Sequence, residues 1–225
     1  LKEAGIGRVN ISLDSLNAET FARITRGGRL QPVLEGIDGA VEAGLTPVKL
    51  NMVVMGGVND HELADMVAFA RQRKVLLRFI EAMPIGEAGF AALGQFVPAT
   101  EIVSRLERTL GTRFVPAGAP QVKSAGPARY YRAVDGDLDI GIISAISQHF
   151  CETCNRVRLT SRGELVLCLG RENQLDLLTP LRDGATDAEL TALIERGLRD
   201  KPWSHEMDSD AGSRRAGPHM VALGG

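Results

Sequence analysis

The chain has 225 residues, 24% of them charged, with a formal net charge of −2. This balance excludes both a disordered acidic tail and a strongly basic nucleic-acid-binding protein. No apolar run approaches the roughly 18 residues of a membrane span, and no signal-peptide pattern opens the chain, so we expect a cytoplasmic protein without a membrane or nucleic-acid partner. A chain of this length buries about 70% of its unfolded surface without a staple, so its three cysteines need another explanation.

The first half of the chain alternates strand and helix signals. Short β-branched, apolar runs predict buried strands at residues 9–13, 48–55 and 75–82. Helices are expected between them, beginning after the N-cap Asn17, at Pro32 as a first helical position, and at Asn59 or Asp60. Strands separated by helices indicate a parallel sheet of βα units.

The second half has a different character. Thr100 is expected to cap a helix, and a capping box from Thr186 to Glu189 opens a final one. Short strands are expected at residues 130–134, 138–143, 156–160 and 164–169, the last two joined by a hairpin turn at 161–163. We therefore predict a boundary near residue 95, with regions 1–95 and 96–225.

The start of the chain is unusual. It opens on Leu1, and residues 1–7 resemble the end of a helix with its stopping glycine. We expect that the front of a longer protein is missing from this sequence.

All three cysteines lie in one window. Cys151, Cys154 and Cys168 form a C-x2-C-x13-C pattern, in which the turn and the following hairpin bring three thiols together. Three thiolates suit an iron–sulfur cluster with one open iron, or a zinc site with His149 as fourth ligand. A redox pair with a separate buried Cys168 is the third alternative, and spacing alone favours metal binding without deciding the metal.

Cationic side chains accompany these motifs. Arg156 and Arg158 alternate on an expected strand, so their guanidinium groups point to one face and could clamp phosphate or carboxylate. Lys49 and Asn51 alternate likewise inside a strand that should be buried, which favours a functional role for them.

These residues belong to a recognisable pattern. The segment 150–160, Gly163 and Cys168-Leu169 resembles the C-terminal cluster region of the GTP 3′,8-cyclases, which are radical S-adenosylmethionine enzymes of molybdenum cofactor biosynthesis. The likeness extends in chain order over residues 9–14, 49–51 with 58–60, 78–84, and the terminal Gly224-Gly225.

The resemblance implies a fold and a reaction. The fold would be α/β, the C-terminal part of an incomplete TIM-like (βα)6 barrel plus a C-terminal α+β cluster-binding region. In that family a [4Fe–4S] cluster near the N-terminus reduces S-adenosylmethionine to a 5′-deoxyadenosyl radical, and the product of GTP is (8S)-3′,8-cyclo-7,8-dihydroguanosine 5′-triphosphate. The product's consumer would be cyclic pyranopterin monophosphate synthase, and a homodimer is an open alternative for the oligomeric state.

The resemblance also implies site residues. A second [4Fe–4S] cluster would be held by Cys151, Cys154 and Cys168 and would meet the guanine. GTP would contact Lys49, Arg78, Arg156, Val157 and Arg158. Ser12 and Met83 would line the S-adenosylmethionine site, and Gly224-Gly225 would form a tail reaching into the active site.

One family motif is missing from these residues. The radical-generating C-x-x-x-C-x-x-C pattern does not occur, so no catalytic residue is assigned and we expect this chain alone not to cleave S-adenosylmethionine. Two alternatives stay open: a non-catalytic zinc- or cluster-binding module, and a related radical enzyme with a different substrate.

Overall fold

The computed structural model describes residues 1–85, 93–118, 126–136, 138–171 and 173–207. The chain forms two compact units, Leu1–Ala82 with Gln95–Gln148, and Met83–Gly94 with His149–Gly225. It therefore crosses between the units after residues 82, 94 and 148. Residues 96–148, which the sequence analysis placed in the region 96–225, belong by compactness with the first unit.

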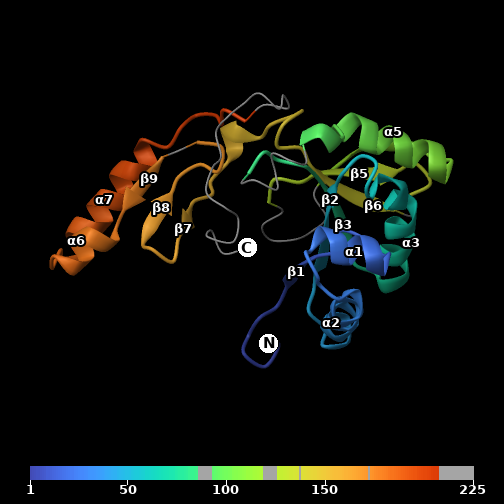
Figure 1. The fold of residues 1–225 in the computed structure, drawn as a ribbon, viewed down its shortest axis with the longest axis horizontal. Helices are drawn as coiled ribbons and strands as arrows, with labels where there is room; N and C mark the ends of the chain where they lie inside the picture. The colour runs from blue at the N-terminus through green and yellow to red at the C-terminus, as the bar shows by residue number, and fades with distance from the viewer. Residues whose placement is uncertain (86–92, 119–125, 137, 172, 208–225) are drawn as a thin grey trace. The chain divides into compact units, whose positions relative to one another are not determined.

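A six-stranded mixed sheet runs through the first unit, in the order β1-β2-β3-β6-β5-β4 (Figure 1). Its strands are β1 (Val9–Ser12), β2 (Val48–Val54), β3 (Leu76–Glu81), β4 (Phe114–Ala117), β5 (Arg129–Ala133) and β6 (Asp139–Ile143). The first three pair in parallel, as the sequence predicts, and β6 adds a fourth parallel strand beside β3. The hairpin β4–β5 extends the sheet in antiparallel fashion.

Helices cover one face of this sheet. They are α1 (Ala18–Ile24), α2 (Leu30–Glu42), the 3-10 turn η1 (Asp60–Glu62), α3 (Leu63–Arg73) and α5 (Ala99–Leu110), with a 3-10 turn η2 (Leu93–Gln95) before α5. The core joins alternate strand residues to the inner faces of α2, α3 and α5; it includes Leu50, Met52, Leu77, Phe79, Ile140 and Ile142 with Ile37, Met66, Val67, Ile102 and Leu106. The side chains at the intervening strand positions point to the opposite face of the sheet and do not belong to this core.

The second unit is built around a small antiparallel sheet. Its elements are the 3-10 turn η3 (Cys151–Thr153), β7 (Arg158–Leu159), β8 (Glu164–Val166), β9 (Gln174–Asp176), α6 (Leu178–Arg182) and α7 (Asp187–Arg199). The hairpin turn predicted at 161–163 is confirmed, because Gly163 N donates to Thr160 O at 3.0 Å and β7 pairs with β8. The capping box of α7 is confirmed as well.

Three helix starts differ from the predictions. Helix α2 begins at Leu30, which places Pro32 at its third position, where a missing N–H is still tolerated. Helix α5 begins at Ala99 rather than after Thr100, and α3 begins at Leu63, beyond the 3-10 turn that follows Asn59. Elements β4, β9 and α6 were not predicted, and the strand expected at 156–160 is reduced to β7.

Over the described ranges, no helix is long and apolar enough to cross a membrane.

Candidate functional site

One face of the first unit's sheet carries polar side chains on three neighbouring strands. In the parallel register, Asn10 is opposite Lys49, while Ser12, Asn51 and Arg78 form one row across β1, β2 and β3. Paired positions of adjacent strands project to the same face, so these five side chains share the face opposite the helix-covered core. Their parity explains why a buried parallel strand contains Lys49 and Asn51.

Arg78 is held in place from several sides. Its Nε donates to Asn51 Oδ1 at 2.8 Å and its Nη2 donates to Asn10 Oδ1 at 2.9 Å. The side chain is 6% exposed, and burial lowers the pKa of Arg78, against the opposing interaction with the Tyr130 hydroxyl. Gly141 gives it room, since a Cβ there would lie 2.8 Å from Arg78 Cγ. The guanidinium is thus a fixed, buried cation.

Lys49 adds a second buried cation. Its side chain is 4% exposed, and the pKa of Lys49 is lowered by burial and then by the charges of Arg78 and Arg8. In the part of the chain that the structure describes, no carboxylate forms an ion pair with Lys49 or Arg78. Buried cations without an anionic partner mark a place where an anionic ligand would be favoured.

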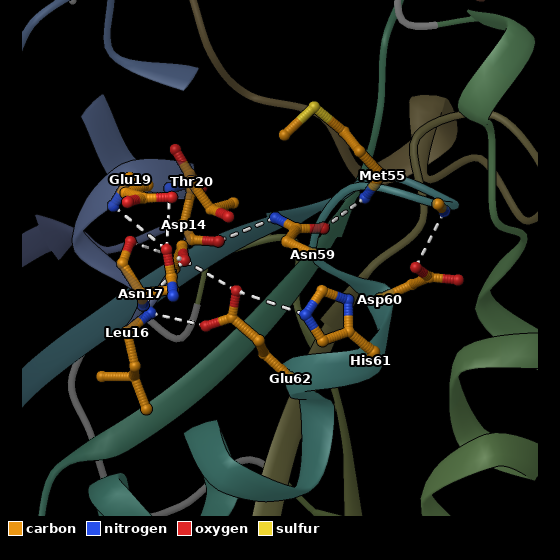
Figure 2. A network of polar contacts seen from close by, with 12 residues as sticks. Asp14, Leu16, Asn17, Glu19, Thr20, Met55, Asn59, Asp60, His61 and Glu62 are labelled. Atoms are coloured by element: carbon orange, nitrogen blue, oxygen red, sulfur yellow. Dashed lines mark hydrogen bonds and ion pairs between the residues drawn. The ribbon is translucent and has the colours of Figure 1, made fainter. Parts of the chain in front are cut away.

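A network of polar contacts fixes the chain where β1 and β2 end (Figure 2). Asp14 Oδ1 accepts from Val53 N at 2.8 Å, and burial raises the pKa of Asp14 although that hydrogen bond acts in the opposite direction. Asn59 Nδ2 donates to Asp14 O at 2.7 Å, and its Oδ1 accepts from Met55 N at 2.8 Å. Asn59 therefore ties two strand ends together instead of capping a helix.

The buried carboxylate of Glu62 joins the loop after β1 to the loop after β2. Glu62 accepts from Ser15 Oγ at 2.7 Å and from Leu16 N at 2.6 Å. Figure 2 shows the contact with Leu16. Both loops lie at the carboxyl ends of parallel strands, the edge where α/β proteins place their chemistry. Glu62 holds that edge rigid.

Glu81 holds the corresponding end of β3. The residue is fully buried, and its carboxylate accepts from Ala99 N at 2.7 Å, from Ile146 N and Ser147 N at 3.0 Å each, and from Ser147 Oγ. The first contact caps α5, which explains why the helix does not begin after Thr100.

The three cysteines lie in the second unit and all are free. Burial raises the pKa of the Cys168 thiol; a backbone hydrogen bond at Gly170 lowers it, and the charges of Cys151 and Cys154 act in the same direction as burial. Within the described ranges, no group of three or more His, Cys, Asp or Glu is arranged to hold a metal ion. Free thiols are donors of the kind that an iron–sulfur centre takes, but the described residues do not gather them in a metal-binding arrangement.

Two arginines lie next to these thiols. Arg156 Cζ lies 5.0 Å from the centre of the Phe150 ring, a cation–π contact that orients the guanidinium. Burial and the charge of Arg156 lower the pKa of Arg158, and Cys154 raises it, which places both arginines within electrostatic reach of each other. Val157, between them, is 37% exposed.

Lys201 contacts the same segment. Its Nζ donates to Cys154 O and Arg156 O at 2.8 Å each, and lies 3.7 Å from Cys154 Sγ. Nothing in the sequence singles out this lysine, since it follows the end of α7 without a motif. Asn10 and Tyr130 were missed too, although the alternation with Ser12 could have indicated Asn10.

Other predicted site residues are placed as follows. Ser12 is exposed, Met83 is half-buried, and Gly224-Gly225 lie outside the described residues. Ile85 N donates to Met83 O at 2.8 Å, which forms a tight turn shortly after β3. The His149 ring packs edge-on against His205 with centroids 5.7 Å apart.

Comparisons with known proteins give a consistent result. The model of the radical SAM superfamily matches residues 1–70, and the model described as Molybdenum Cofactor Synthesis C matches residues 75–207. Proteins named GTP 3′,8-cyclase from Hydrogenovibrio crunogenus and Desulforamulus reducens are 46% and 44% identical over all 225 residues, which span 67% of each relative. The protein of that name from Listeria monocytogenes is 40% identical over 207 residues, 92% of this chain and 60% of the relative.

Proposed function

The chain belongs to the GTP 3′,8-cyclase family of radical S-adenosylmethionine enzymes of molybdenum cofactor synthesis, and from this premise we propose that its protein converts GTP to (8S)-3′,8-cyclo-7,8-dihydroguanosine 5′-triphosphate. The observation that carries the proposal is the pair of buried cations, Lys49 and Arg78, without a described carboxylate partner. A nucleoside triphosphate supplies the anion that this face lacks.

The fold agrees with that proposal. We propose that β1, β2, β3 and β6 form part of an incomplete TIM-like (βα)6 barrel, with the helices outside and the row of Ser12, Asn51 and Arg78 inside. S-adenosylmethionine would lie at the carboxyl ends of the strands, near Ser12 and Met83.

The cysteine unit would receive the base. We propose that Cys151, Cys154 and Cys168 hold a [4Fe–4S] cluster, which supplies one iron without a cysteine ligand for a nitrogen or oxygen of the substrate. Arg156 and Arg158 would bind GTP phosphates, with the backbone at Val157 between them, and Gly224-Gly225 would approach the substrate.

These 225 residues hold only part of the machinery. All of their cysteines lie between 151 and 168, so they contain no C-x-x-x-C-x-x-C motif. We therefore propose that this chain alone binds GTP and a cluster but does not cleave S-adenosylmethionine, and that the protein's product passes to cyclic pyranopterin monophosphate synthase.

Anaerobic reconstitution of the chain with iron and sulfide tests the proposal. We expect broad absorbance near ~400 nm, its loss in Cys168→Ala, and a change of the cluster's electron paramagnetic resonance on adding GTP. Tight uptake of zinc without that absorbance and without GTP affinity would instead establish the zinc-binding module.

A further inference from the structure

Lys201 uses all three donors of its ammonium group on one short segment. Two go to the carbonyl oxygens of Cys154 and Arg156, at 2.8 Å each, and the third points to Cys154 Sγ at 3.7 Å. These acceptors are two main-chain groups and a thiol. Among the described residues, Lys201 has no carboxylate partner, so it is not one half of a surface ion pair.

The fold delivers Lys201 to this place from a fixed element. It directly follows Asp200, the C-cap of α7. Helix α7 approaches the small sheet closely at Gly197, where a Cβ would lie 2.9 Å from Leu175 Cδ2 of β9 and 3.8 Å from Leu167 Cδ2, next to Cys168. The lysine thus connects the end of a packed helix to the cysteine turn.

We propose that Lys201 is a positioning residue that sets the backbone from Cys154 to Arg156, and with it the directions of one thiolate and one guanidinium. The proposal rests on the proposed function, because it assumes that these two groups serve a cluster and GTP. A backbone bridged at residues i and i+2 by one cation cannot rotate the peptides between them without losing a hydrogen bond.

An ammonium suits this task better than a guanidinium. Its three donors radiate from one small atom, whereas arginine presents its donors in a flat fork. Arginine at position 201 could reach both carbonyls but could not also direct a donor to the sulfur. This difference gives the conservative variant a diagnostic value.

The test compares Lys201→Met and Lys201→Arg with Lys74→Met, which removes an exposed lysine of the first unit. In the metal-free chain, we expect amide exchange at residues 154–158 to become about tenfold faster in Lys201→Met and to stay near wild type in Lys201→Arg and the control. After reconstitution, we expect iron release to a chelator to be about tenfold faster in Lys201→Met.

The reduction potential of the cluster separates positioning from general stability. Loss of the cation beside Cys154 should shift the cluster's reduction potential to a more negative value in Lys201→Met, while Lys201→Arg retains it. Wild-type exchange and potential in Lys201→Met would overturn the proposal. If Lys201→Met does not fold, Lys201→Arg decides. It keeps the two carbonyl contacts and loses the contact to Cys154 Sγ, so we expect amide exchange near wild type with faster iron release, and iron release at the wild-type rate would overturn the role of Lys201 at the thiolate. Failure of the wild-type chain to take up a cluster or bind GTP would instead refute the proposed function, and the exchange of the metal-free chain would still test Lys201.

Discussion

Lys49 and Arg78 share one sheet face although their positive charges repel each other. The pKa of Lys49 is lowered by burial and by Arg78, so the folded state holds its ammonium at a cost in free energy. Asn10 and Asn51 orient Arg78 without neutralising it. Such an arrangement is destabilising until an anion binds, which is a common property of ligand sites.

Replacing Lys49 with methionine should therefore weaken binding and strengthen the fold. We expect GTP affinity to fall about 10- to 100-fold, from the loss of one charge-assisted hydrogen bond, and the free energy of unfolding to rise by about 1 kcal/mol at pH 7. Because the folded-state pKa is below the unfolded one, this gain should be complete below the folded pKa and should vanish as pH rises through the unfolded pKa. Calorimetric GTP titration and thermal unfolding measure the two effects.

The control is Lys74→Met, which removes an exposed lysine and should change neither GTP affinity nor stability. Unchanged GTP affinity in Lys49→Met would contradict the assignment of Lys49 to the GTP site.

Asp14 provides a pH-dependent test in the loop after β1. Burial raises its pKa, so the folded state binds the proton more tightly than the unfolded state. The contribution of Asp14 to stability therefore declines as pH rises from the unfolded pKa of about 4 through the folded pKa. Asp14→Asn keeps an acceptor for Val53 N and should lack that decline, so its melting temperature relative to wild type should increase over this window. A difference that is constant with pH would contradict the prediction.

At this scale, sequence could predict the residues that belong to a pattern, either an alternation along a strand or a regular spacing of cysteines. Lys49 and Asn51 stand out because polar residues at alternate positions interrupt an apolar strand. Lys201 and Tyr130 could not be found in that way, because their roles depend on contacts with residues 47 and 52 positions away in the chain.

At the scale of elements, helices α7 and α5 begin with different kinds of cap. Helix α7 is capped locally, since Thr186 Oγ1 accepts from Glu189 N and the Glu189 carboxylate accepts from Thr186 N at 2.8 Å. Helix α5 is capped by Glu81 from another strand. A cap formed by neighbouring residues can be recognised in a sequence, whereas a cap supplied by a distant residue cannot. This difference explains why the start of α7 was predicted correctly and the start of α5 was not.

The local cap predicts the effect of one substitution. Thr186→Ala should lower the free energy of unfolding by about 1 kcal/mol, because it removes the side chain that accepts from Glu189 N. Thr191→Ala is the matched control in the same helix; there the hydroxyl donates to Asp187 O, a contact that contributes little to helix stability. Urea unfolding measures both, and equal losses would argue against the capping role.

Sheet composition was the hardest element-scale feature to predict. The three N-terminal strands could be predicted from their apolar runs, and their parallel pairing follows from the helices between them. The place of β6 beside β3 could not, because helix α5 and the strands β4 and β5 lie between β3 and β6 in the chain. Similarly, β9 has only three residues, too few for a recognisable alternation.

At the scale of the whole molecule, one carboxylate joins residues that lie close in sequence to each of the three crossings between the units. Glu81 precedes the first crossing, Ala99 follows the second, and Ile146 and Ser147 precede the third. All of these residues meet at the Glu81 side chain, so the ends from which the chain leaves the first unit are tied to one another.

Glu81→Gln should loosen those ends together. Glutamine offers one acceptor oxygen where the carboxylate offers two, and its NH2 group faces backbone donors, so we expect a loss of about 2–4 kcal/mol in stability. Amide exchange at Ala99, Ile146 and Ser147 should accelerate together. Glu62→Gln, at another buried carboxylate of the same unit, should leave those three amides protected. If the amides of Ala99, Ile146 and Ser147 stayed protected in Glu81→Gln, Glu81 would not be the residue that joins these chain ends.

The pairing of β3 with β6 also has a consequence for synthesis. Arg78 pairs with Gly141, roughly 60 residues later, so at ribosomal rates of about 5–20 residues per second the outer edge of β3 waits several seconds for its neighbour. During that interval the nascent chain exposes an unpaired, largely apolar strand, the kind of edge that invites association with another chain. Protection of this edge, by a chaperone or by early collapse onto α3 and α5, would then decide how much of the newly made protein reaches its folded state.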